Sequence, residues 1–125
     1  MTTAYWCVLI AALMPYVWTG VAKARAGGRY DNRDPRAYLA GQQGISRRAN
    51  AAQLNAFEAF APFAAAVIIA QLAQTPQDTV DALAIGFVVA RALYGIAYIL
   101  DRPTLRSLLW AVGLGCVVAL FVVAA

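Results

Sequence analysis

The sequence predicts an all-α integral membrane protein, a bundle of four membrane-spanning helices. Of its 125 residues, 62% are hydrophobic and 13% are charged, whereas soluble domains average about 45–50% apolar and about 25% charged. A chain this short cannot cover so much apolar surface in a single water-soluble core. Lipid is the remaining environment for that surface, and within it only helices or closed barrels satisfy their own backbone groups.

Four apolar runs define the predicted spans. Each is close to the ~20 residues that cross ~30 Å of hydrocarbon at a rise of about 1.5 Å per residue. We expect the spans at about residues 3–24, 49–73, 80–100 and 105–125, and they form one domain over residues 1–125. The charges that lie well inside these spans are Glu58 in the second and Arg91 in the third.

The distribution of charge predicts the orientation in the membrane. Nine of the ten basic residues lie between Lys23 and Arg48 or between Asp101 and Arg106, and the connection between spans two and three has none. Under the positive-inside rule, the loops between spans one and two and between spans three and four face the cytoplasm. These basic residues account for the net charge of +4 without a nucleic-acid partner, and they suit contact with membrane lipid headgroups.

Several kinds of site are excluded by composition. The chain contains no histidine, and its two cysteines, Cys7 and Cys116, lie inside apolar runs. Histidine-based catalysis and most metal sites therefore lack their ligands, and we predict no metal. The cysteines are expected to pack as small hydrophobic side chains.

Placing Glu58 or Arg91 in lipid has an unfavourable free energy of about 2.5–3.5 kcal/mol or more per residue. Counted from the cytoplasmic ends of their spans, both lie roughly 15 Å deep, so an ion pair can form between the two helices, within one protomer or between neighbours. Asn55 and Tyr94 come one turn nearer the cytoplasm, at roughly 10 Å. The matching depths predict that these four side chains meet.

The polar residues continue toward the basic surface. Tyr98 shares a helix face with Tyr94 and Arg91, and the mouth of this polar column is formed by Arg102, Arg106 and Ser107. One interpretation is that these polar side chains form hydrogen bonds between the helices and so fix their register. The other is a ligand site for a small anionic molecule, because arginine suits carboxylates and a tyrosine hydroxyl donates to a developing thiolate or oxyanion. Without further information, both remain open.

The order of these motifs resembles the MAPEG family, the membrane-associated proteins of eicosanoid and glutathione metabolism, and in particular its bacterial members. Span two has the Asn-x-x-Glu pattern at Asn55 and Glu58, followed by Pro62-Phe63. The later motifs are Arg91-x-x-Tyr94-x-x-x-Tyr98 and the Arg-x-x-x-Arg-Ser pattern that runs from Arg102 to Arg106 and Ser107. With the chain length and the four spans, the resemblance covers essentially the whole chain.

The resemblance implies a homotrimer in the bacterial inner membrane that binds glutathione as cosubstrate between neighbouring protomers, in their cytoplasmic half. The expected activity is that of a transferase or peroxidase, in which an activated glutathione thiol attacks a lipophilic electrophile or hydroperoxide. The catalytic residues implied are Arg106, Ser107 and Tyr94. The glutathione-binding residues implied are Asn55, Glu58, Arg91, Tyr94, Tyr98 and Arg102.

One position departs from the family pattern. Enzymatic members carry an arginine four residues before the asparagine, and this chain has Ala51 there. A membrane protein that keeps the MAPEG scaffold without catalysis is therefore an alternative. A small multidrug-type transporter is a weaker alternative, because such transporters use a carboxylate in the first span, whereas Glu58 lies in the second and has Arg91 at its depth.

Overall fold

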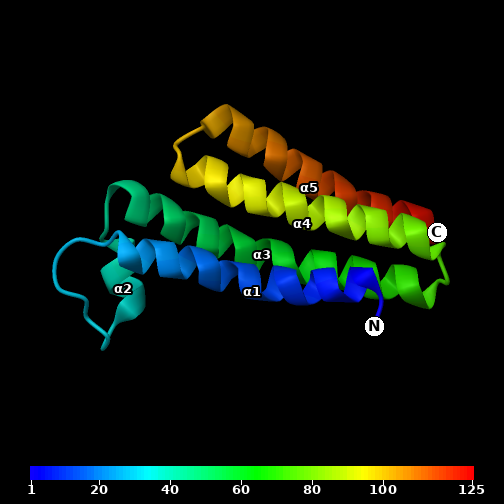
Figure 1. The fold of residues 1–125 in the computed structure, drawn as a ribbon, viewed down its shortest axis with the longest axis horizontal. Helices are drawn as coiled ribbons and strands as arrows, with labels where there is room; N and C mark the ends of the chain where they lie inside the picture. The colour runs from blue at the N-terminus through cyan, green and yellow to red at the C-terminus, as the bar shows by residue number, and fades with distance from the viewer.

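The computed structural model describes all of residues 1–125, and every regular element in it is a helix. The helices are α1 (Thr3–Ala24), α2 (Pro35–Ala40), α3 (Gly44–Leu72), α4 (Gln77–Ile99) and α5 (Pro103–Ala124) (Figure 1). All except α2 are long and apolar enough to cross a membrane. The predicted all-α bundle of four spanning helices is confirmed.

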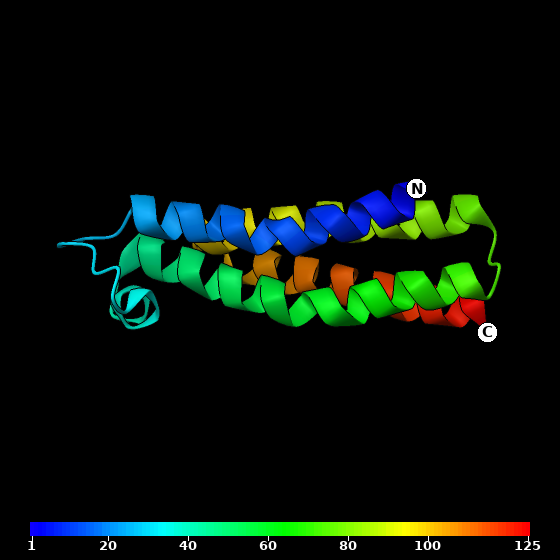
Figure 2. The same cartoon turned by 90° about the horizontal axis from the view of Figure 1, so that it is seen from below.

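The four long helices form two antiparallel pairs. α1 lies along α3 and α4 lies along α5, and the pairs meet through contacts of α4 with α1 and α3 and of α5 with α3. In Figures 1 and 2 the four helices run nearly parallel to the long axis, and the α4–α5 pair diverges from α1 and α3 toward the end that carries α2.

Small residues let α1 and α3 approach closely. Ala22 of α1 and Ala49 and Ala52 of α3 are fully buried, and Ser46 donates a hydrogen bond to the carbonyl oxygen of Ala22 at 2.7 Å. Association of helices in lipid depends on such close packing because lipid removes the hydrophobic drive between them. The bulkier core contact is the parallel stack of Phe63 on Phe87, with ring centroids 3.9 Å apart.

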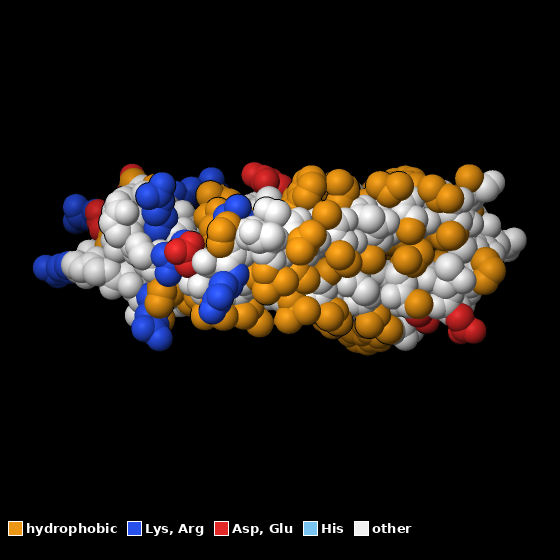
Figure 3. Space-filling model, turned by 90° about the horizontal axis from the view of Figure 1, so that it is seen from above, with side chains coloured by type: hydrophobic (Ala, Val, Ile, Leu, Met, Phe, Trp, Pro, Cys, Tyr) orange, Lys and Arg blue, Asp and Glu red, His pale blue; other side chains and the backbone are white.

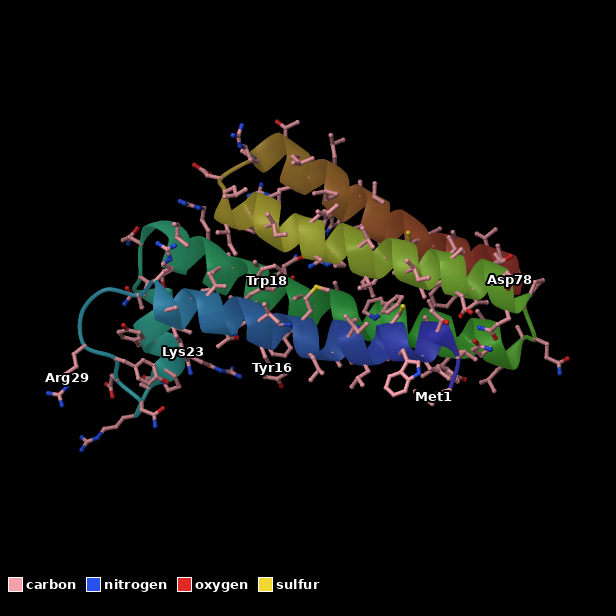
Figure 4. All side chains as sticks on the ribbon, viewed as in Figure 1. Met1, Tyr16, Trp18, Lys23, Arg29 and Asp78 are labelled. Carbon is pink, nitrogen blue, oxygen red and sulfur yellow. The ribbon has the colours of Figure 1, made fainter.

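A close contact joins α1 to α4. Trp18 of α1 is 7% exposed, and a Cβ atom built on Gly95 of α4 would overlap its indole ring. Figure 4 shows Trp18 directed into the bundle, whereas Tyr16 points away from it. Gly95 is therefore required by the space that the indole occupies.

The loop between the first two spans contains a short helix, α2, that the apolar runs of the sequence did not predict. Asp34 accepts a hydrogen bond from the backbone of Ala37 at 3.2 Å, and Pro35 occupies the first turn of α2. A capping aspartate followed by proline is a helix-start signal. α3 also begins at Gly44, ahead of the apolar run, because its helical hydrogen bonds continue through the polar residues near the membrane surface.

The two ends of the bundle differ in charge. We call the end formed by the C-terminus of α1, by α2, by the start of α3 and by the α4–α5 turn the basic end. Lysine and arginine side chains gather there, and hydrophobic side chains cover most of the remaining length (Figure 3). In Figure 4, Lys23 and Arg29 lie at the basic end, and Met1 and Asp78 lie at the opposite end.

Hydrogen bonds fasten the end opposite the basic end. The carboxylate of Asp81 on α4 accepts from the backbone N–H of Ala4 at 2.8 Å and from Nε2 of Gln77 at 2.7 Å. A carboxylate at the first turn of α1 satisfies a free N–H and complements the helix dipole. α1 and α4 are thus joined far from the basic end.

Candidate functional site

Arg91 lies at the centre of the polar column, on the side of α4 that faces the bundle. It is 4% exposed. Its guanidinium carbon lies 4.2 Å from the centroid of the Tyr94 ring, and Nη2 donates to Oδ1 of Asn55 on α3 at 2.6 Å. A charge this deep requires such partners, because burial without them costs several kcal/mol.

Asn55 stands between Arg91 and Glu58. Its Oδ1 accepts from Arg91, and its Nδ2 donates to Oε2 of Glu58 at 3.4 Å. The sequence analysis considered a direct ion pair between the two charged residues, and the structure instead links them through the amide. The physical reason is that Asn55 faces α4, whereas the next turn of α3 carries the exposed Glu58 toward the outside of the protomer.

Aromatic rings continue the column from Arg91 to Arg106. Tyr94 and Tyr98 meet edge to face, with centroids 5.8 Å apart, and the guanidinium carbon of Arg106 lies 4.7 Å from the centroid of the Tyr98 ring. Two cations thus flank a pair of tyrosines along α4 and the start of α5. Stacking of arginine on aromatic rings holds the guanidinium groups in place while their N–H donors stay available.

Two adjoining cavities open beside this column. The polar cavity, of about 290 Å³, is lined by Asn55, Tyr94, Tyr98, Arg106, Ser107 and Trp110. The apolar cavity, of about 250 Å³, is lined by Asn55, Glu58, Ala59, Pro62, Phe87, Arg91, Trp110, Leu114 and Val117. Both are bounded by Asn55 and Trp110, so they form one trough between α3 and α5, with α4 as its floor.

The structure brings most of the predicted site residues together around this trough. All of them except Arg102 line one or both cavities, and Ser107 is exposed at the outer side. Arg102 occupies the N-cap position of α5, is exposed and lines neither cavity. Its side chain therefore lies apart from the others.

Trp110 is the residue of the trough that the sequence analysis missed. It is 46% exposed and lies one helical turn beyond Arg106, in the part of α5 that carries no charge. The sequence could have indicated Trp110, because it lies four residues after Arg106 and residues four apart on a helix share a face. The apolar wall formed by Phe87, Leu114 and Val117 had no such signal, since those residue types occur throughout the spans.

The remaining comparison is with known proteins. A model of the MAPEG family matches residues 3–125. The chain belongs to the MAPEG family. A search of curated proteins gave no match, and a search of solved structures gave none.

Membership of the MAPEG family places the protein in a group of multi-pass membrane proteins of glutathione and eicosanoid metabolism. Together with the four apolar helices, it makes this chain an integral membrane protein. The MAPEG model accounts for nearly the whole chain.

The trough combines three chemical properties in a small space. Arg106 supplies a cation, Tyr94 supplies a hydroxyl group, and Glu58 supplies a carboxylate, all at the wall of an otherwise apolar bundle. A guanidinium beside a thiol favours its thiolate form and so lowers the pKa of that thiol. The polar cavity can thus hold an anionic sulfur, and the apolar cavity beside it can hold a lipophilic group.

Proposed function

We propose that this protein is a membrane-embedded, glutathione-dependent transferase or peroxidase that acts on a lipophilic electrophile or hydroperoxide. The observation that carries the proposal is the trough itself, in which Arg106 and Tyr94 line a polar cavity that adjoins an apolar one. A thiol held at Arg106 lies next to a space suited to an apolar substrate. Bringing the two reactants together in this way is a main source of rate enhancement.

The residues present fit glutathione, which is a tripeptide with carboxylate groups. Asn55 offers N–H donors and Glu58 offers acceptor oxygens on neighbouring turns of α3, and together they match the C=O and N–H of a peptide group. Arg106 adds a donor for an anionic group. Glutathione supplies the thiol whose sulfur is the nucleophile.

Within this proposal, each catalytic residue has a distinct role. Arg106 stabilises the thiolate by charge, and its stacking on Tyr98 fixes the direction of its donors. Tyr94 donates its hydroxyl hydrogen to the sulfur, and Ser107 offers a further hydroxyl at the edge of the polar cavity. In conjugation a carbon–sulfur bond forms and the leaving group departs with its electron pair, while the thiol proton is released to solvent.

We further propose that a second copy of the chain covers the trough, as a homotrimer would provide. Glu58 and Trp110 are exposed on the surface of the isolated protomer. A carboxylate at this depth is costly against lipid, and a neighbouring protomer with glutathione between the two removes that contact. Under the positive-inside rule, we propose that the basic end faces the cytoplasm. We propose that the membrane is a bacterial inner membrane.

A non-catalytic MAPEG protein is the second candidate, and Ala51 is the observation that favours it. The position that carries arginine in enzymatic relatives has a methyl group here. If the polar column serves only to hold α3, α4 and α5 together, the protein assembles without binding glutathione.

An activity assay separates the two. The protein, purified in detergent, is incubated with glutathione and either a chlorodinitrobenzene-type electrophile or a lipid hydroperoxide. We expect saturable turnover that Arg106→Ala reduces by at least about tenfold, whereas Arg33→Ala, in the exposed loop, retains it. Wild-type protein that is folded, inactive and unable to bind glutathione would refute the proposal and leave the non-catalytic scaffold.

A further inference from the structure

Arg91 is enclosed to a degree that separates it from the other residues of the trough. Its own helix α4 and three others enclose it. Asn55 of α3 accepts a hydrogen bond from the guanidinium, and Tyr94, one turn further along α4, places its ring beside it. Residues of α1 and α3 form a gap of about 10 Å³ on a further side. That gap is about the size of a single water molecule. Arg91 reaches the wall of the apolar cavity, but at 4% exposure its side chain has little surface there for a substrate.

α5 encloses Arg91 on the remaining side. A Cβ atom on Gly113 would lie 3.3 Å from Cδ of Arg91 and 3.9 Å from its Cγ. Gly113 is itself buried. A side chain there would require the aliphatic stem of Arg91 to shift by a few tenths of an ångström, so Gly113 fits the observed position of the guanidinium.

The hydrogen bond from Arg91 determines which way the Asn55 amide points. Arginine has donors and no acceptor, so only the oxygen of Asn55 can face it. The NH₂ group must then face the opposite way, toward Glu58 and the trough. Without Arg91 the amide could rotate by half a turn and present its oxygen to the ligand instead.

We propose that Arg91 is a positioning residue that acts through Asn55: it fixes the amide so that the NH₂ group is offered to a carbonyl or carboxylate oxygen of the thiol cosubstrate. Because Glu58 accepts from the same amide, its carboxylate is held with an oxygen free for an N–H group. This inference rests on the proposed function, since it concerns how glutathione is recognised, and it removes Arg91 from the residues that contact glutathione.

A double-mutant cycle tests this role. Arg91→Met removes the donor at similar volume, and we expect glutathione to bind about tenfold more weakly, while kcat at saturating glutathione stays within about twofold. Arg91→Lys keeps one donor and should recover part of the affinity. In an Asn55→Ala background, Arg91→Met should change the Kd by less than about twofold, because the amide through which Arg91 acts is gone.

A glycine pair gives a second test that leaves every polar group in place. Gly113→Ala crowds the stem of Arg91 and should weaken glutathione binding several-fold. Gly115→Ala is the matched control on the same helix, since a Cβ there meets nothing within 4 Å. Thermal unfolding in detergent verifies that all variants are folded.

The outcomes separate this inference from the proposed function. One outcome is that wild-type protein binds glutathione while Arg91→Met weakens that binding by the same factor in the wild-type and Asn55→Ala backgrounds. Arg91 then acts on the ligand without Asn55, so this inference is overturned and the proposed function stands. Equal affinity of Gly113→Ala and Gly115→Ala overturns it as well. If wild-type protein binds no glutathione, the proposed function and this inference fall together.

Discussion

Arg48 donates from Nε to the carbonyl oxygen of Ile99 at 3.1 Å, which joins the start of α3 to the last residue of α4. A cation at the C-terminal carbonyls of a helix satisfies a free acceptor and complements the helix dipole. Arg48 is one turn from Ala51, the position at which the resemblance described above leads us to expect arginine. Arg48 lines neither cavity of the trough, and its Nε is bonded to Ile99, so in this structure it does not occupy the place of that arginine.

We therefore expect Ala51→Arg to strengthen glutathione binding. The new guanidinium adds a charged donor one turn below Asn55, and such a bond corresponds to about tenfold in Kd. Isothermal calorimetry in detergent measures the change. Ala51→Met, of similar length but uncharged, is the control and should leave the affinity unchanged; an equal effect of both variants would show that charge at this position is irrelevant.

The contact of Arg48 with Ile99 should contribute to stability. Arg48→Met removes the only side-chain hydrogen bond recorded at the end of α4, and we expect a loss of about 1 kcal/mol in the free energy of unfolding. Chemical or thermal unfolding in detergent tests this. Arg47→Met, at the exposed neighbouring position, serves as the control, and a loss of the same size there would contradict the assignment.

Gly95→Ala should destabilise the bundle by about 1–3 kcal/mol, the usual effect of overpacking. The added methyl group overlaps the ring of Trp18, which the bundle encloses. Gly20→Ala is the matched control in α1, because its Cβ meets nothing within 4 Å, and it should be neutral or stabilising by up to ~1 kcal/mol. Similar melting temperatures for the two variants would disprove the close packing of Trp18 on Gly95.

Tyr94→Phe tests the hydroxyl without disturbing the stack. The ring that lies against Arg91 and Tyr98 is retained, so glutathione affinity should change little. We expect kcat to fall about 10- to 100-fold through loss of a donor to the reacting sulfur. Tyr16→Phe, on the outer surface of α1, is the control. An unchanged kcat in Tyr94→Phe would exclude the hydroxyl from catalysis.

The fold could be predicted from the sequence because lipid imposes a simple rule on it. Runs of apolar residues of the right length must be helices, and all four spans were found on that basis. The rule applies only within the hydrocarbon of the membrane. It therefore predicts neither α2 nor the early start of α3 at Gly44. Both depend on local hydrogen bonds near the membrane surface.

Much of the site could also be predicted, because polar side chains in apolar spans must find each other. Depth counting brought Asn55 of α3 and Tyr94 of α4 to one cavity. Depth cannot give the rotation of each helix about its axis. For that reason the sequence suggested a direct pairing of Glu58 with Arg91, and it gave no sign that Gly113 makes room for the arginine.

The proposed function requires glutathione to be held as a thiolate beside Arg106. The direct measurement is the ultraviolet difference spectrum on adding glutathione to the detergent-purified protein, because a thiolate absorbs where the neutral thiol does not. We predict a saturable thiolate band in the wild type that is lost in Arg106→Ala and kept in Arg33→Ala. A wild-type spectrum equal to the sum of protein and free glutathione would contradict the account.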